Sequence, residues 1–406
     1  MNASTATSAL CLHSGAPFWL LASGLEEIAS PLRSEADVAI IGAGVTGALV
    51  ADALTAEGKS VVLVDRRAPA TGSTAASTAL LQYEIDRELH DLIGLVGEQD
   101  AVRAYRLSAQ AIDRLEGICS LLGADCGFRR RSSLYLASSR RDRNRLDAEY
   151  AVRSRFGFDV ARWTRAEVEA RYGFPSHGAL RNESAGEVDP VKLTRALLAR
   201  AISRGAAVLS RTTVREVTSS PSGVRLVTDR GLVEAGQVVY AMGYEVPPAL
   251  RQELVTLNST FAVVTEPLED FGRWDDQCLV WETARPYTYV RSTCDHRIIC
   301  GGADIPFKSV ALRERAMPAQ LVRLEQSLGK LFPSLPLTRD FAWAGTFGET
   351  PDGLPYIGPS PFMQHAFFAL GYGGNGITFS VTAADILADL CLGRFNADAR
   401  IFRLDR

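Results

Sequence analysis

The sequence predicts a two-domain α/β fold, and three observations lead to this prediction. Residues 37–67 read as a strand, a glycine-rich turn, a helix and a second strand, which is typical of a Rossmann-like unit. Residues 185–255 show a similar alternation of helices and short strands. Residues 259–301 instead contain short strand-like segments, which are typical of an antiparallel sheet. We therefore expect a Rossmann-like nucleotide domain with an inserted antiparallel-sheet domain.

The first of these units carries the most specific motif. Three glycines follow its first strand in the GxGxxG spacing, and Asp65 ends its second strand. Gly42 allows the tight turn, Gly44 lets backbone N–H groups approach a pyrophosphate, and Gly47 lets the helix pack closely on the strand. The helix N-terminus favours negative charge, and Asp65 can accept hydrogen bonds from a ribose 2′-OH. The motif predicts a dinucleotide site without choosing between FAD and NAD.

Composition excludes several functional classes. The chain has 406 residues, is 47% hydrophobic and carries a net charge of −3, so we expect no general attraction to nucleic acid or to an anionic membrane. The seven cysteines are scattered without a CxxC motif, and the five histidines have no metal-ligand spacing. We expect reduced thiols, no metal site and a cytoplasmic location. No segment is long and apolar enough for a membrane-spanning helix.

Periodicity and turn residues indicate the helices and strands of the remaining chain. Asp189 and Pro190 are a good helix start, because Asp caps an N-terminus and Pro suits the first helical position. Further helices are expected at 45–57, 98–122, 140–156, 192–204, 311–331 and 377–392. Strands are expected at 38–41, 60–64, 128–137, 207–210, 214–217, 224–228, 232–234, 237–243, 259–265, 278–281, 287–291 and 297–301.

This layout predicts a discontinuous domain organisation. Residues 1–35 form a leader that lacks the features of a signal peptide, and its Phe18 and Trp19 are expected to pack on the folded body. The nucleotide domain is expected to comprise 36–95, 185–255 and 335–406, and the second domain 96–184 and 256–334. A ligand site between two such domains is a common arrangement.

Five segments together resemble one family, the FAD-dependent amino-acid and amine oxidoreductases of the D-amino-acid oxidase, glycine oxidase and sarcosine oxidase type. They occur in the family's order and read DVAIIGAG…VDRR (37–67), GSTAAS (72–77), GEVDPVKL (186–193), VVYAMG (238–243) and a C-terminal block of WAG, TPDGLP and GYGGNGIT (343–345, 350–355 and 371–378). The C-terminal block favours FAD over NAD, because NAD-only Rossmann enzymes have no reason to carry it. The leader with its aromatic pair favours the amine-oxidising branch.

The resemblance implies which residues bind FAD. The first glycine turn would hold the pyrophosphate, Asp65 the adenosine ribose, and Val214 the adenine. The small-residue loop would line the phosphate and flavin side, and backbone N–H groups at the start of the last helix would stabilise negative charge on the flavin ring. The predicted cofactor residues are Gly42, Gly44, Val45, Thr46, Gly47, Asp65, Arg66, Ser73, Thr74, Ser77, Val214, Gly243, Gly345, Gly373, Gly374, Asn375, Gly376, Ile377 and Thr378.

The resemblance also implies the chemistry. A C–H bond next to the amine nitrogen of an amino acid or amine would deliver hydride to flavin N5, and the resulting imine would hydrolyse. Tyr287, Tyr289 and Arg291 alternate on one predicted strand and so share a face, where they could bind substrate. Arg291 could clamp a carboxylate and the tyrosines could contact a cation; the alternative is a structural patch at a sheet edge. Tyr244 and Tyr372 are further candidates.

Two departures from the family pattern limit this expectation. Residues 343–350 contain no cysteine, so the covalent flavin attachment of some relatives is excluded there and FAD should be non-covalent. Residues 297–302 contain no lysine, which some relatives use near the flavin for reaction with oxygen. The acceptor could be O₂ or a carrier. Alternatives are a D-amino-acid or hydroxy-acid dehydrogenase feeding a quinone, and a non-catalytic FAD-binding subunit of an oligomer.

Overall fold

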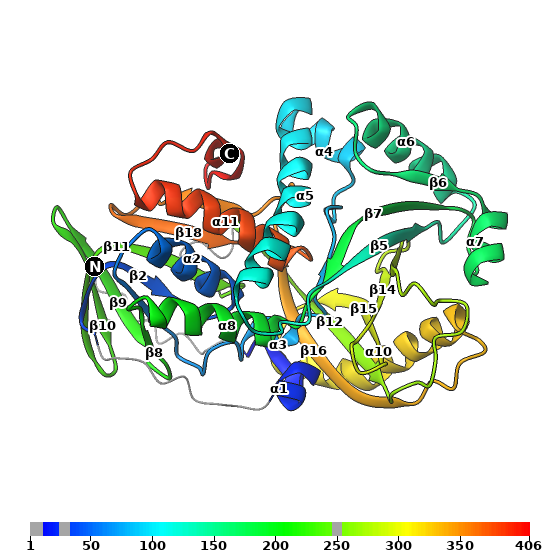
Figure 1. The fold of residues 1–406 in the computed structure, drawn as a ribbon, viewed down its shortest axis with the longest axis horizontal. Coiled ribbons are helices and arrows are strands. Elements are labelled where there is room, and N and C mark those ends of the chain that lie inside the picture. Colours follow the sequence, from blue (N-terminus) through cyan, green and yellow to red (C-terminus); the bar gives the residue numbers. More distant parts are fainter. Residues whose placement is uncertain (1–10, 24–32, 246–253) are drawn as a thin grey trace.

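The computed structural model describes residues 11–23, 33–245 and 254–406, which form two β-sheets flanked by helices (Figure 1). An eight-stranded sheet lies on the left of that view and a ten-stranded sheet on the right. The chain moves between the two sheets several times, so each sheet is built from segments that are far apart in the sequence. The predicted two-sheet α/β fold is confirmed.

The centre of the eight-stranded sheet is parallel. Strands β18, β11, β2, β3 and β8 lie in that order and run parallel, and β17 pairs antiparallel to β18 at one edge. The four residues of β3 are all buried, as expected for a strand that is covered on both faces. The bounds are β2 (Glu35–Ile41), β3 (Val61–Val64), β8 (Ala207–Leu209), β11 (Gly231–Gly243), β17 (Tyr356–Pro359) and β18 (Ala366–Leu370).

Strand β11 extends beyond this parallel part and forms a second, antiparallel layer. Its first half pairs with β10 (Gly223–Thr228), and β10 pairs with β9 (Val214–Ser220). The predicted pairing of 224–228 with 232–234 is confirmed by the register of Val224 opposite Ala235. Apolar side chains of β10 join those of β2 and β3 in one core, so this layer covers one face of the parallel strands.

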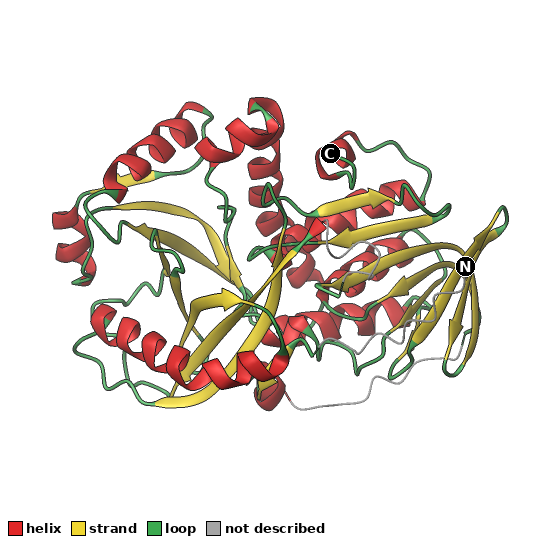
Figure 2. Cartoon of the chain, turned by 180° about the vertical axis from the view of Figure 1, so that it is seen from behind, coloured by secondary structure: helices red, strands yellow, loops and turns green. Residues whose placement is uncertain are grey.

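Helices cover the other face of the parallel strands (Figures 1 and 2). Helix α2 packs against α8 and α11, and α11 packs against α5. Asp189 caps α8 as predicted, because its Oδ1 accepts hydrogen bonds from the N–H groups of Val191 and Lys192. The bounds are α2 (Val45–Ala56), α5 (Glu98–Leu121), α8 (Pro190–Ser203) and α11 (Gly376–Cys391).

The ten-stranded sheet is antiparallel as predicted, apart from one parallel pair between β5 and β13. Helix α10 (Val310–Leu331) packs against β12, β15 and β16. The strands are β1 (His13–Gly15), β4 (Leu80–Leu81), β5 (Arg129–Leu136), β6 (Ala161–Trp163), β7 (Ala179–Glu187), β12 (Thr256–Thr265), β13 (Leu279–Glu282), β14 (Thr288–Ser292), β15 (Ile298–Pro306) and β16 (Arg339–Glu349). Shorter helices are α1 (Phe18–Ser23), α3 (Ser73–Ala76), α4 (Leu89–Val96), α6 (Asp142–Arg155), α7 (Arg165–Tyr172) and the 3₁₀ helix η1 (Ala397–Phe402).

The predicted domain boundaries stay a prediction, and two elements bear on them. Strand β16 belongs to the ten-stranded sheet, although it lies in the segment 335–406 assigned to the nucleotide domain. Helix α5 packs on α11, although it lies in the segment 96–184 assigned to the second domain. Both elements therefore connect the two halves of the molecule.

The described part of the N-terminal leader is integrated into the fold. Strand β1 pairs antiparallel with β16, and α1 follows it directly. Phe18 and Trp19 are each only 4% exposed, and the Phe18 ring packs edge-on against Phe341. The expectation that this aromatic pair packs on the body is confirmed.

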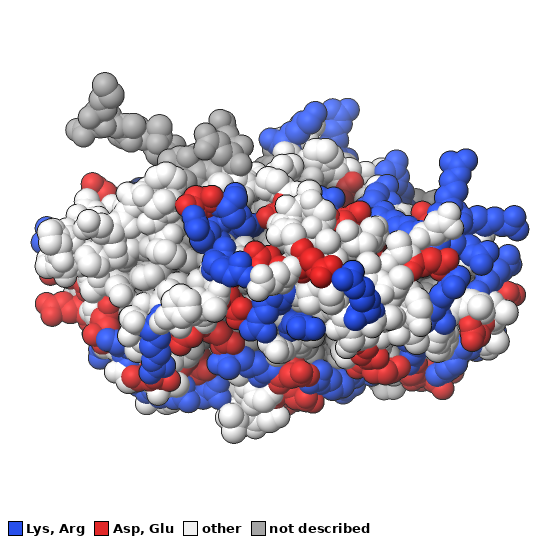
Figure 3. All heavy atoms as spheres, turned by 90° about the horizontal axis from the view of Figure 1, so that it is seen from above, with Lys and Arg blue, Asp and Glu red and all other residues white. Residues whose placement is uncertain are grey.

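Basic and acidic side chains are interspersed over the face that Figure 3 displays, as a net charge of −3 would suggest. Within the described ranges, no helix has the length and apolar character needed to cross a bilayer. All seven cysteines lie in these ranges and each is a free thiol.

Candidate active site

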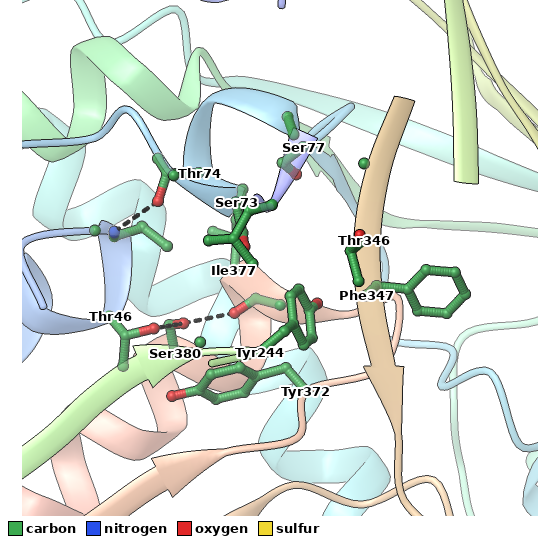
Figure 4. Close-up of a pocket in the computed structure, with 18 of the residues that line it drawn as sticks. Thr46, Ser73, Thr74, Ser77, Tyr244, Thr346, Phe347, Tyr372, Ile377 and Ser380 are labelled. Carbon is green, nitrogen blue, oxygen red and sulfur yellow. Dashed lines mark hydrogen bonds between the residues drawn. The ribbon is translucent and has the colours of Figure 1, made fainter. Parts of the chain in front are cut away.

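A cavity of about 750 Å³ lies at the junction of the two sheets. One side is formed by the carboxyl ends of β2, β3 and β11, the N-terminus of α2, and helix α3. The other side is formed by residues of β12, β14, β15 and β16, and the start of α11 closes it between them. Figure 4 shows labelled residues of α2, α3, β16 and α11 gathered around one space.

Two of the three glycines at the start of α2 lie so close to backbone atoms that a larger residue would clash. Gly42 has φ of +112°, and a Cβ added there would lie 2.3 Å from the carbonyl oxygen of Ala241. A Cβ on Gly47 would lie 1.9 Å from the carbonyl oxygen of Gly42, which fits its predicted role in close packing. A Cβ on Gly44 would lie 3.0 Å from Thr74 Oγ1. The turn therefore presents bare backbone to the cavity.

Helix α3 lies against the start of α2 and adds hydroxyl groups to the same wall. Thr74 Oγ1 accepts a hydrogen bond from the Val45 N–H at 3.0 Å, which fixes the two helices together (Figure 4). Ser73 Oγ lines the cavity and, within the described part of the chain, is buried without a hydrogen-bond partner. A buried hydroxyl without a partner is costly. A bound ligand with acceptor oxygens would satisfy it.

Asp65 stands at the carboxyl end of β3, where the Rossmann pattern places a ribose contact. Its Oδ2 accepts from the N–H of Ala43 at 2.7 Å and its Oδ1 from the N–H of Arg67 at 2.8 Å. Burial raises the pKa of the Asp65 carboxyl. Beside it, Arg66 and Arg67 both form ion pairs with Glu245. Residues 212–215 complete this end of the cavity.

The start of α11 is tied to α2 and to the loop at 82–86. Ser380 Oγ donates to the carbonyl of Gly376 at 2.6 Å and lies 2.7 Å from Thr46 Oγ1, so the threonine donates to the serine. Asn375 Nδ2 donates to the carbonyl of Glu84 at 2.8 Å. The hydroxyl of Tyr244 donates to the carbonyl of Gly373 at 2.7 Å. These contacts hold the glycine-rich segment in place at the cavity wall.

The far end of the cavity is aromatic and acidic. The ring centroids of Tyr287 and Tyr289 lie 5.6 Å apart, and Trp281 lies next to Tyr287 at 6.3 Å. The Tyr287 hydroxyl donates to Asp86 Oδ1 at 2.8 Å, and the N–H of Gly374 donates to Asp86 Oδ2 at 2.7 Å. Burial in the cavity wall raises the pKa of Asp304 to about 7.

Most of the predicted site residues line this cavity. They are Gly42, Gly44, Val45, Thr46, Asp65, Arg66, Ser73, Thr74, Ser77, Val214, Gly243, Gly345, Gly373, Gly374, Asn375, Gly376 and Ile377, together with Tyr287 and Tyr289. Tyr244 and Tyr372, the further candidates, line it too. Gly47, Thr378 and Arg291 do not line it. Thr378 turns into its own helix, where its hydroxyl donates to the carbonyl of Asn375.

Arg291 does not point into the cavity with the two tyrosines. Its guanidinium is buried beneath the site and donates to the backbone carbonyls of Ser292, Thr78, Ala79 and Val188. It also lies 3.4 Å from Glu187 and 5.3 Å from the centroid of the Trp19 ring. The predicted carboxylate clamp is therefore not supported by the geometry, because Arg291 does not line the cavity and its Nε and Nη1 donate to backbone carbonyls.

Several residues of the far end were not singled out from the sequence. Glu84 and Asp86 lie in a segment without periodicity, so no pattern connected them with a strand 200 residues later. Asp304 follows the expected end of a strand at 301, whereas β15 runs on to Pro306. Extending the alternation of that strand was the one sequence signal that could have found Asp304.

A search against protein families matches residues 37–390 to the DAO family model, described as FAD-dependent oxidoreductase. The chain belongs to the DAO family of FAD-dependent oxidoreductases. It is 26% identical to a glycine oxidase of Bacillus licheniformis, covering 89% of this chain and 94% of that protein. It is 23% identical to a probable oxidoreductase, OrdL, of Haemophilus influenzae, covering 88% and 83%. The solved glycine oxidase of Geobacillus kaustophilus matches with a TM-score of 0.78 at 22% identity, covering 92% and 99%, and so has the same fold.

The residues of this DAO-family cavity fit the FAD that the family requires. The bare glycine turn of α2 and the unpartnered Ser73 hydroxyl suit a pyrophosphate, and the Asp65 end suits an adenosine. A volume of about 750 Å³ lies in the upper part of the range of small-molecule and cofactor sites. Oxidation of amino acids is the activity typical of this family.

Proposed function

We propose that this DAO-family protein binds FAD non-covalently and oxidises the carbon–nitrogen bond of a small amine or amino acid. The observation that carries the proposal is the continuity of the cavity. The cavity joins the glycine turn of α2 to an aromatic and acidic end at β14 and β15, with the start of α11 between them. A cofactor lying along this cavity would bring its reactive ring to the aromatic end.

When bound, FAD supplies a two-electron acceptor to which the C–H bond beside the amine nitrogen delivers hydride, leaving an imine that hydrolyses in water. The chain's own residues bind and orient the substrate for this step. Tyr287 and Asp86, joined by a hydrogen bond, form one wall, and Tyr289 forms another, with its hydroxyl 3.3 Å from Thr260 Oγ1. Tyr244 donates to the Gly373 carbonyl and so fixes the glycine-rich segment that would contact the bound cofactor.

The experiment that tests this proposal is anaerobic reduction of the flavin by candidate substrates. The purified protein is mixed with glycine, sarcosine, D- and L-alanine, primary amines and N-alkyl amines, and the loss of flavin absorbance near 450 nm is followed, with dithionite as the positive control. We expect bleaching by at least one of these classes. If dithionite bleaches the flavin and none of the amines does, the proposed amine oxidation is wrong and a non-catalytic FAD-binding subunit is favoured.

The electron acceptor is a separate question, and a carrier is the second candidate. The chain has four lysines, Lys59, Lys192, Lys308 and Lys330, and none of them lines the cavity. This favours transfer to a quinone or another carrier over rapid reaction with O₂. Reoxidation of the reduced protein by air and by a dye acceptor, compared in a stopped-flow instrument, distinguishes an oxidase from a dehydrogenase.

A further inference from the structure

The charge of the cavity's far end indicates what kind of substrate it accepts. Three acidic residues line this end, Glu84, Asp86 and Asp304. They stand among Tyr244, Trp281, Tyr287, Tyr289 and Phe347. Carboxylates combined with the faces of aromatic rings are the surroundings that bind organic cations.

Two of these carboxylates have unused acceptor atoms. Glu84 is 3% exposed; its Oε1 accepts from Asn182 and pairs with Arg153, whereas its Oε2 has no hydrogen-bond partner among the described residues. Asp304 Oδ1 is likewise buried and unpartnered within the described chain. Asp86 differs, because both of its oxygens accept hydrogen bonds that hold it at the wall. A bound ammonium group would supply the missing donors.

The cationic side chains that line the cavity lie elsewhere. Among its described lining residues these are Arg66, Arg67 and Arg215, at the Asp65 end, and the first two share the charge of Glu245. Arg291, the predicted clamp, is enclosed by backbone carbonyls beneath the site. The described lining of the far end therefore offers a carboxylate-bearing substrate no opposite charge, and burying an unpaired carboxylate beside Asp86 and Asp304 is unfavourable.

Two exposed arginines lie near the far end without lining it. Arg285 lies 4.9 Å from the centroid of the Tyr287 ring, and its guanidinium donates to the carbonyls of residues 282–284. Arg87 donates to the carbonyl of Pro351. Both donate to backbone carbonyls outside the cavity and neither lines it; the charge of Arg285 reaches Asp304, where it opposes the rise in pKa that burial causes.

We propose that the substrate carries a second positive charge, as in a diamine or longer oligoamine, and that the acidic aromatic end of the cavity binds this second charge while the other amine is oxidised. The proposal rests on the proposed amine oxidation and narrows its substrate class. One amine, in its neutral form, would donate hydride from its adjacent carbon. The other, as ammonium, would lie against Asp86, Asp304 and the tyrosine rings.

A series of three four-carbon amines tests this, because its members share one primary amine and differ in the terminal group at the other end. Butylamine ends in a methyl group, 1,4-diaminobutane in an ammonium and 4-aminobutanoate in a carboxylate. The apparent dissociation constant is measured from anaerobic flavin reduction and, independently of turnover, by calorimetric titration of the oxidised holoprotein. We expect 1,4-diaminobutane to bind at least about tenfold more tightly than butylamine, and 4-aminobutanoate to bind most weakly.

Variants connect the preference with the named carboxylates. Asp86→Asn and Asp304→Asn should each reduce the preference for the diamine over butylamine by about tenfold, and Glu269→Gln, at an exposed carboxylate outside the cavity, should leave it unchanged. Circular dichroism and flavin content show that each variant is folded.

The outcomes separate the two proposals. Tightest binding of 4-aminobutanoate, or no difference among the three amines, overturns the cation site. Reduction by glycine, sarcosine or alanine without binding of the diamine also overturns it, but leaves the proposed amine oxidation standing. Calorimetric binding of the diamine with no flavin reduction by any compound supports the cation site and overturns the proposed oxidation.

Discussion

Replacement of Asp304 by asparagine should stabilise the protein, and increasingly so at higher pH. Burial raises the pKa of Asp304 to about 7, with Asp86 and Glu349 contributing further, whereas the pKa of an unfolded Asp is about 3.9. Between these values the folded state holds a proton that the unfolded state has lost. The contribution of Asp304 to the free energy of unfolding is therefore largest below about pH 4. It falls between pH 4 and pH 7 and is lost as the pH rises through the folded pKa.

The size of the effect follows from the pKa difference. A shift of about three units corresponds to roughly 4 kcal/mol in total, of which about 2.5 kcal/mol falls between pH 5 and pH 8. A chain of this length has an unfolding entropy of about 0.85 kcal/mol/K, so the gain of the variant over the parent should grow by about 3 °C in Tm over that range.

The assay is thermal unfolding of the parent and Asp304→Asn holoproteins from pH 5 to pH 8, with Glu269→Gln as the control for removing an exposed carboxylate. A Tm difference that grows with pH supports the buried, unpartnered carboxylate. A difference that stays constant over this range would refute the reasoning, because it would mean that Asp304 titrates as an ordinary surface group.

Three further predictions concern the surroundings of the cavity. Gly301→Ala would put a Cβ 2.3 Å from the Tyr289 ring, so we expect substrate affinity to fall by about tenfold with the flavin-to-protein ratio unchanged, as measured by absorbance titration. Arg291→Met should lower the unfolding free energy by about 3–5 kcal/mol, while the folded holoprotein keeps its affinity for amines. A selective loss of amino-acid binding would instead show that Arg291 binds the substrate carboxylate. Trp19→Phe removes the indole N–H that donates to the Ser77 carbonyl at 2.7 Å, which should weaken FAD binding by about 1–3 kcal/mol; unchanged FAD affinity in apoprotein titrations would count against this support.

The cofactor end of the cavity could be predicted from the sequence because local patterns encode it. Gly42 has a positive φ and Gly47 packs against Gly42 itself, which are local requirements, and Asp65 ends the second strand of the same motif. Helix ends such as Asp189–Pro190 are local in the same way. These features need no knowledge of how the second sheet is folded.

The substrate end could not be predicted in the same way, because it is made by contacts between distant segments. Asp86 meets Tyr287 across 201 positions of the chain, and no spacing rule connects them. Arg291 shares the alternation of Tyr287 and Tyr289, but it stands near the other end of β14, which passes beneath the cavity. There its guanidinium donates to the carbonyls of residues 78, 79 and 188. Alternation predicts which side chains lie on the same face of a strand, but it does not predict what packs against each of them.

A single-turnover experiment tests the central claim most directly. The holoprotein is mixed without oxygen with an excess of an amine that bleaches the flavin, and the carbonyl compound formed after imine hydrolysis is quantified against the flavin reduced. Amine oxidation at this site predicts one equivalent of carbonyl product for each flavin, with loss of both signals in Gly44→Val, which would fill the phosphate cradle beside Thr74. Flavin reduction without carbonyl product, or product formation that persists in Gly44→Val, would contradict it.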